Sequence, residues 1–245
     1  MILHRGRSRL TRAKEWFNVV VTGLTVKSKN PKTGEMAQVW ILPDEPVAIP
    51  DDKLQAKENR KIVCGDCKLL TTNSCYVNVA WAPTSIQNAI RNNAYPQLNL
   101  DKLEGTSLRW GAYGEPSIIP FKLMTKINKL VRMFTGYTHQ WHKKWAQPYK
   151  KFLMASCQSK SEKETANQKG WRSFRIGSSV NDILEDEVLC PSSKEYELIS
   201  GKRSPCIRCN LCCGTSARIK KNIFIVGHGG SSVKSNILKL IEKDN

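Results

Sequence analysis

The sequence lacks any apolar run that approaches the roughly 20 residues of a membrane-spanning helix, which argues against a membrane protein. The N-terminus also lacks an apolar segment followed by small residues, the pattern of a secretory signal peptide. Acidic residues are few, with 21 Asp and Glu against 39 Lys and Arg. We therefore expect a soluble, cytoplasmic protein with no membrane partner and a strongly basic surface.

The formal net charge of +18 predicts an acidic partner, since a basic surface attracts phosphate polymers and releases their counterions on contact. DNA or RNA is the expected partner. The alternative is that the dispersed lysines only keep the protein soluble. The basic residues cluster locally in an N-terminal arm (His4, Arg5, Arg7, Arg9, Arg12 and Lys14) and in a second stretch (Arg218, Lys220 and Lys221).

The 245 residues, 40% of them hydrophobic, are enough to bury a sizeable core. The first part of the chain reads as short strands over residues 19–24 and 38–42, joined by a segment with Asn-Pro and Thr-Gly turn formers. This pattern predicts an N-terminal β-hairpin. The polar stretch over residues 43–60 is expected to be a surface loop.

From residue 76 onward, short β-rich runs alternate with helix-capable segments. The runs are YVNVA, SLRWG, RMFTGYT, KFLMASC, WRSFRIG, EVLC and NIFIVGHG, and the candidate helices span residues 83–93, 117–130, 161–169 and 233–243. Such alternation is typical of parallel strands joined by right-handed crossovers. We therefore predict an α/β fold with a complete or partial parallel, TIM-like barrel.

Although the length also allows two small domains, we expect one α/β domain over residues 1–245. In it, residues 1–60 form the arm, hairpin and loop, and residues 61–245 form a βα-repeat core with cysteine-rich loops.

Nine cysteines in a reducing compartment are expected to stay free or to bind metal. The spacing C-x-x-C-x-x-C-C occurs at Cys206, Cys209, Cys212 and Cys213, and Cys190 precedes it at the end of an expected strand. Two-residue spacers let one loop place successive thiolates around one centre, as iron–sulfur clusters and tetrahedral zinc require. The pattern predicts a metal-binding C-terminal insertion that holds a cluster, of the 4Fe-4S type by its spacing, or zinc.

A second group, Cys64, Cys67 and Cys75, predicts three further metal ligands, and Gly65 gives their loop freedom to turn. Three ligands leave one position for another cysteine, a histidine or a substrate atom, and an open position distinguishes a catalytic site from a structural one. Both groups could build a single region or two separate sites. The alternative for all these thiols is inert burial, which is the better interpretation for Cys157 on its apolar run.

Further candidate residues follow the expected strands, where parallel α/β folds bind their ligands. Arg109 and Arg175 are candidate cofactor-binding residues, and Glu115, His139 and His228 are candidate catalytic residues. Each has a structural alternative. Glu115 could simply begin the next helix, His139 could pack among aromatic rings, and the GHGG run around His228 could be a plain strand-to-helix turn rather than an anion cradle.

Many separated motifs together resemble an uncharacterised cysteine-rich protein family of bacteriophages, prophages and plasmids, distantly similar to the phage family called gene product 88. These motifs are RGRSRLTRAK, VTGLTVKSKNPKTGEMAQVWIL, CGDC, CYVNVAWAP, LRWGAYGEPSIIP, GYTHQW, LMASC, GWRSFRI, LCPSSKE, CIRCNLCCG and IVGHG. The resemblance covers nearly the whole chain and implies a mobile-element context, a host-cell cytoplasmic location and work on DNA or RNA. The doubled Cys212-Cys213 and the lack of a C-x-x-x-C-x-x-C loop weaken the inference of a cluster, and radical S-adenosylmethionine enzymes are an analogy of fold only. The Cys-Pro that usually follows a ferredoxin-type loop is also missing.

The sequence therefore predicts a phage-type metalloprotein that acts on or binds nucleic acid. The alternative is a non-catalytic module in which zinc staples the chain and the basic surface binds DNA or RNA. A third hypothesis, an inhibitor of a host protein, has no positive feature in the sequence.

Overall fold

The expected N-terminal hairpin is present in the computed structural model, which describes residues 1–244. Strands β2 (Trp16–Thr22) and β3 (Ala37–Pro43) pair antiparallel, with Val19 opposite Ile41. A further strand that the sequence pattern did not predict, β1 (Ile2–Arg7), pairs antiparallel with β2. Half of the basic residues of the N-terminal arm (His4, Arg5 and Arg7) therefore lie in the sheet, and the other half lie between β1 and β2.

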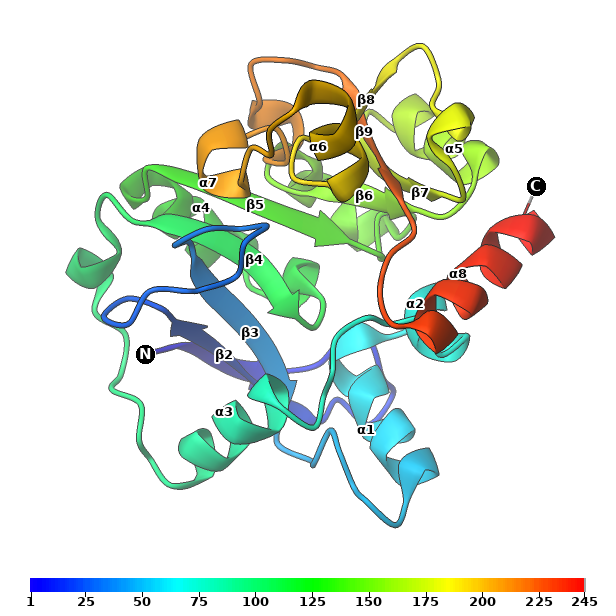
Figure 1. Ribbon diagram of the computed structural model, residues 1–245. Helices are drawn as coiled ribbons and strands as arrows, with labels where there is room; N and C mark the ends of the chain where they lie inside the picture. Colours follow the sequence, from blue (N-terminus) through cyan, green and yellow to red (C-terminus); the bar gives the residue numbers. More distant parts are fainter. Residues whose placement is uncertain (245) are drawn as a thin grey trace.

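The remaining strands continue the same sheet in parallel (Figure 1). They are β4 (Ser107–Tyr113), β5 (Met133–Thr138), β6 (Met154–Cys157), β7 (Ser173–Gly177), β8 (Glu187–Leu189) and β9 (Asn222–Val226). Within the described chain the nine strands follow the order β1-β2-β3-β4-β5-β6-β7-β9-β8, and the neighbours from β3 onward are parallel. The predicted mostly parallel α/β fold is confirmed.

The complete barrel is wrong, because the sheet is open. A barrel closes only when its two edge strands pair with each other. Over residues 1–244, β1 pairs with β2 alone, and β8 pairs with β9 alone. One edge of the sheet is the antiparallel strand β1, and the other edge is the short strand β8, which lies outside β9. In the part of the chain that the structure describes, these two edge strands do not pair with each other.

Helices surround the sheet and connect its strands (Figure 1). The α-helices are α1 (Lys53–Cys64), α2 (Lys68–Thr71), α3 (Ala82–Arg91), α4 (Phe121–Leu130), α5 (Lys160–Gln168), α6 (Lys194–Ser200), α7 (Cys206–Cys209) and α8 (Ser231–Asp244). Single 3₁₀ turns are η1 (Leu100–Leu103), η2 (Pro116–Ile118), η4 (Val180–Asp182) and η5 (Gly214–Ser216), and η3 (Lys144–Lys151) is longer. The four predicted helices correspond to α3, α4, α5 and α8.

The two faces of the sheet have different surroundings. On β4, the indole Nε1 of buried Trp110 donates to Asn128 Oδ1 of α4 at 2.9 Å, so this side chain lies on the helix-covered face. Because successive strand residues point to opposite faces, Arg109 lies on the other face. There the loops around the cysteines cover the sheet, including the segment with α6 and α7 between β8 and β9.

Two local predictions are wrong. The stretch over residues 43–60 contains the start of α1 at Lys53. The side chain of the N-cap residue Asp52 accepts a hydrogen bond from the Gln55 amide at 2.8 Å. The YVNVA run is no strand but an extended loop that leads into α3. This run lies over the sheet face that carries Arg109 and does not pair with a strand of the described sheet.

Candidate functional site

A cavity of about 470 Å³, here called the main cavity, lies on the sheet face opposite α4. Its floor consists of side chains from five strands, namely Trp40, Arg109, Tyr137, Phe174 and Ile225. Its walls come from residues 30–33, from residues 76–83, and from Cys190 and Cys206. Segments that are far apart in the sequence therefore meet around one space.

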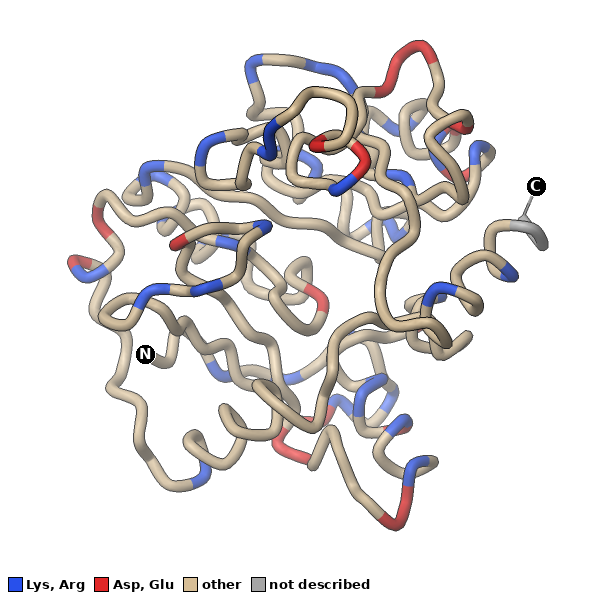
Figure 2. The backbone as a smooth tube through the Cα atoms, viewed as in Figure 1, with Lys and Arg blue, Asp and Glu red and all other residues tan. Residues whose placement is uncertain are grey.

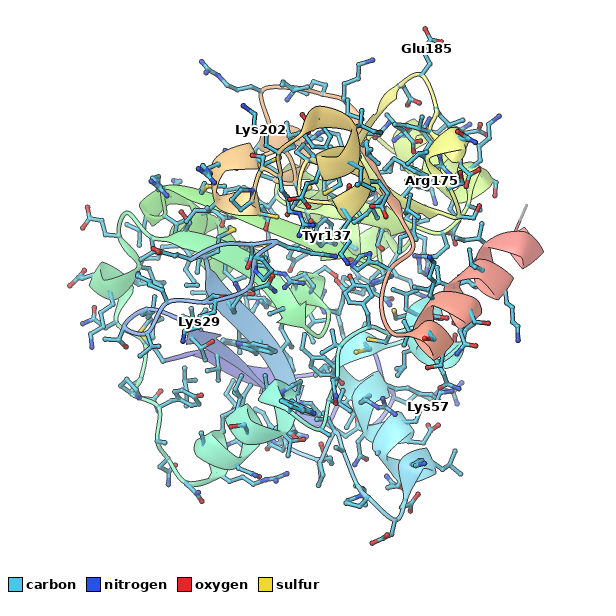
Figure 3. The ribbon with its side chains drawn as sticks, viewed as in Figure 1. Lys29, Lys57, Tyr137, Arg175, Glu185 and Lys202 are labelled. Carbon is cyan, nitrogen blue, oxygen red and sulfur yellow. The ribbon has the colours of Figure 1, made fainter. Side chains whose placement is uncertain are left out.

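A smaller pocket of about 90 Å³, here called the inner pocket, adjoins the main cavity. Six residues line both spaces: Tyr76, Val77, Arg109, Ala112, Tyr137 and Phe174. The inner pocket is lined in addition by Cys64, Cys67, Cys75, Glu115 and His139. Tyr137, at the centre of Figure 3, thus stands between the surroundings of the two cysteine groups.

The C-terminal cysteine group (Cys190, Cys206, Cys209 and Cys212) comes from two segments. Cys190 follows β8, and its amide donates to the Phe224 carbonyl oxygen at 2.8 Å. Cys206 and Cys209 are the two ends of α7, and a left-handed turn at Asn210 leads on to Cys212. The Cys212 carbonyl oxygen accepts from the Gly136 amide at 3.0 Å, which holds this loop against β5.

The pKa values of these thiols reflect their proximity. Burial raises the pKa of Cys212 well above its usual value, and the charges of Cys190 and Cys206 raise it further. Burial likewise raises the pKa of Cys190 to about 12, with contributions from Cys206 and Cys209. Several neighbouring buried thiols cannot all ionise without a compensating cation. The group is therefore electrostatically suited to a cationic centre.

The geometry is looser than that of a single-ion site. Over residues 1–244, no three or more His, Cys, Asp or Glu side chains are arranged as the ligands of one metal ion. Tetrahedral zinc with Zn–S bonds of about 2.3 Å requires its sulfur atoms to lie within about 4 Å of one another. The Cys213 thiol is directed to the Asn210 carbonyl oxygen at 3.5 Å, and its charge acts on Cys209.

The N-terminal cysteine group (Cys64, Cys67 and Cys75) lies around the inner pocket with His139. Cys64 ends α1, and Cys67 is the N-cap of α2. Burial alone would lower the pKa of His139, but the charge and hydrogen bond of Cys67 raise it to about 9. Burial alone would raise the pKa of Cys67, yet the His139 contact and nearby backbone amides lower it. The sequence did not specify this cysteine–histidine pair.

Tyr113 also lines the inner pocket, and its side chain is 4% exposed. Burial raises the pKa of Tyr113 well above its usual value, and the charges of Cys64 and Cys75 and a hydrogen bond with Cys64 raise it further. The Tyr113 hydroxyl therefore lies beside the thiols of the N-terminal cysteine group.

Glu115 is a fixed structural carboxylate at this pocket. Its Oε1 accepts from the amide and hydroxyl of Ser117 at 3.0 and 2.6 Å, which caps η2. Its Oε2 accepts from the His139 amide at 2.9 Å. The structural alternative for Glu115, the start of the following helical turn, is therefore confirmed, and the carboxylate also positions His139.

The other three candidates occupy different places. Arg109 lines both spaces, and its Nη1 donates to the Gln38 amide oxygen at 3.5 Å. His228 lies at the main cavity with its ring 5.2 Å from that of Tyr76, and burial lowers its pKa. Arg175 borders neither space, because its guanidinium is paired with Glu187. Its position gives no support to a cofactor contact.

The sequence analysis did not name several cavity residues as site candidates. Lys32, Tyr76, Trp81 and Tyr137 lie within the motifs quoted above, but only the fold brings them to the cavity. Tyr76 had one signal, since it directly follows Cys75.

Comparisons with known proteins add no relative: no protein-family model, curated protein or solved structure matches the chain. Among residues 1–244, no helix has the length and apolar character needed to cross a bilayer.

Proposed function

We propose that this protein is a metalloprotein that holds an iron–sulfur cluster on its C-terminal cysteine group and binds or acts on nucleic acid. The observation that supports the proposal is the mutual electrostatic influence of four largely buried thiols, from segments on either side of α6, of which Cys190 and Cys206 line the main cavity. A cluster of several iron atoms is wider than one ion, so it fits thiols that influence one another without converging on a point. When bound, it would supply electron transfer.

The N-terminal cysteine group is proposed as a second centre. Three thiolates leave one position for His139 or for a ligand that enters from the main cavity. Glu115 holds the His139 backbone amide, and the Cys67 thiol contacts the His139 ring, so two of the four donors already lie together. The Tyr113 hydroxyl, beside Cys64 and Cys75, would border the same centre.

Zinc is the second candidate for this centre. Three cysteines with one histidine form a common donor set of structural zinc sites, and the Cys67–His139 contact brings two of the four together. A protein with zinc here and no iron would be the stapled nucleic-acid-binding module.

The proposed nucleic-acid partner rests on charge. The chain carries 39 Lys and Arg against 21 Asp and Glu, and these cations are spread over several elements in Figure 2. Not all of the clusters are available, because Arg5 pairs with Asp44 at 2.6 Å and Arg9 covers the Trp145 ring. Lys32 and Arg109, which line the main cavity, form no salt bridge within the described residues.

Metal analysis of anaerobically purified protein tests the proposal. We expect brown protein with iron and acid-labile sulfide, and the Cys206→Ser/Cys209→Ser variant should lose both from the C-terminal centre. Cys157→Ala is the matched control, since Cys157 is buried on β6 outside both groups. Colourless wild-type protein with stoichiometric zinc would instead support the stapled module, and protein without any metal would overturn both.

A further inference from the structure

The lining of the main cavity is aromatic and basic. Aromatic rings contribute a large part of its surface, namely Trp40, Tyr76, Trp81, Tyr137, Phe174 and His228. Its charged side chains are Lys32 and Arg109, and no Asp or Glu lines it in the described chain. This combination matches a ligand that has both a flat ring and a negative charge.

The two cations face the cavity together. The side chains of Lys32 and Arg109 both line the main cavity. Neither Lys32 nor Arg109 forms a salt bridge within the described residues. Cations held near each other without carboxylate partners are stabilised by a bound anion.

The rim of the cavity is built to hold these groups in place. The Lys32 carbonyl oxygen accepts from the Cys206 amide at 2.8 Å and from the Ser192 hydroxyl at 2.7 Å. The indole Nε1 of Trp40 donates to Thr22 Oγ1 at 2.9 Å. Lys32 is thus fixed to the cysteine loop, and one aromatic wall is fixed to the sheet.

Two of the aromatic rings, those of Tyr76 and Trp81, are exposed to solvent at the mouth of the main cavity. Trp81 is 76% exposed and directly precedes α3, and Tyr76 is 42% exposed with its ring near His228. Exposed aromatic rings beside cations are the usual means by which proteins stack and hold unpaired bases. Lys29 lies on the adjoining loop before Lys32 (Figure 3).

We propose that the main cavity binds one nucleotide unit, with its base against Trp81 and Tyr76 and its phosphate at Arg109 and Lys32. This inference rests on the proposed nucleic-acid function and defines where that ligand binds. The same chemistry is offered by a free mononucleotide and by an unpaired residue of single-stranded DNA or RNA. A base-paired duplex does not offer it, because its bases are stacked inside.

The experiment measures binding of the full-length, metal-loaded protein to two probes. One is a fluorescein-labelled single strand of about 12 nucleotides, within the usual site size, and the other is adenosine 5′-monophosphate. The variants are Trp81→Ala, Arg109→Gln and Lys32→Gln. Trp16→Ala and Lys126→Gln are the matched controls, on β2 and on α4. Metal content is measured on each preparation, so that loss of a centre is distinguished from loss of binding.

We expect each cavity variant to weaken binding about tenfold or more, while the two controls stay within about twofold of wild type. Binding of the single strand with this pattern supports a polynucleotide ligand, and binding of the monophosphate alone supports a free nucleotide. Single-strand binding that the cavity variants leave unchanged would overturn the inference but keep the nucleic-acid partner. Absence of binding by both probes would overturn both, whatever the metal content.

Discussion

The guanidinium of Arg175 and the carboxylate of Glu187 form a buried two-point ion pair that spans β9. Nε of Arg175 donates to Oε1 at 2.8 Å, and Nη2 donates to Oε2 at 2.6 Å. Their side chains are 7% and 0% exposed, and the guanidinium lies 4.7 Å from the centre of the Phe224 ring. The pair fixes the end of the sheet, and Arg175, a predicted cofactor-binding residue, lines neither the main cavity nor the inner pocket.

Glu187→Gln is therefore predicted to destabilise the fold strongly. Removal of one partner leaves the Arg175 cation buried without a counter-charge, which costs about 3–5 kcal/mol of unfolding free energy. Urea unfolding followed by circular dichroism measures the change. The double variant Arg175→Met/Glu187→Leu should be less destabilised than Glu187→Gln, because no charge then remains buried. A loss below about 1 kcal/mol in Glu187→Gln would contradict the assignment.

Stability is predicted to fall in acid through Asp186. Although burial alone would raise its pKa, hydrogen bonds from Lys163 and Asn222 lower it below the usual 3.8. The folded-state pKa is thus below the unfolded value, so the contribution is present above about pH 4 and is lost as the pH falls through the folded value. Asp186→Asn should flatten this dependence in unfolding curves measured between about pH 5 and pH 2, whereas the exposed-site control Asp51→Asn should retain it.

The sequence predicted those elements in which local pattern and tertiary environment agree. Residues 19–24 and 38–42 have apolar runs around an Asn-Pro turn signal, and they form β2 and β3. Helix α1 was missed because polar residues dominate its composition: of its four buried residues, one is Asn59 and only Ala56, Ile62 and Val63 are apolar. The YVNVA run has strand propensity, but strand pairing depends on a neighbour that propensity does not encode.

The candidate site could be predicted from the sequence only in part. The short spacing between cysteines is visible in the sequence, so the N-terminal and C-terminal cysteine groups could each be identified. The fold, however, brings Cys190 close to Cys206 and His139 close to Cys67. This proximity depends on parallel strands that place distant loops over one face of the sheet. Arg175 and Glu115 were named as site candidates because they are charged and follow expected strands. The sequence does not show that both side chains are buried and held by hydrogen bonds to neighbouring residues.

Metal removal is predicted to loosen the cysteine-rich loop between β8 and β9. This loop has only short helices, and a bound centre would supply its main cross-links. We expect trypsin to cleave after exposed Lys202 (Figure 3) faster in chelator-treated protein than in metal-loaded protein. Cleavage after exposed Lys14, in the loop between β1 and β2, is the internal reference. Equal rates at Lys202 in both forms, with metal loss verified, would argue against a centre held by this loop.

Gly114→Ala is predicted to disturb the inner pocket through the backbone. Gly114 has a φ of +79°, and a Cβ there would lie 2.4 Å from the Ile41 carbonyl oxygen, so both strain and collision with β3 are expected. Gly105→Ala is the matched control, because its φ is +67° but no atom lies within 4 Å of the added carbon. The control should lose about 1 kcal/mol of unfolding free energy through strain alone, and Gly114→Ala should lose about 1–3 kcal/mol more through overpacking.

Since Gly114 precedes Glu115, which holds the His139 amide, only Gly114→Ala should also reduce metal retention by the N-terminal cysteine group. Equal losses of stability in the two variants would mean that the approach of this turn to Ile41 does not constrain the site.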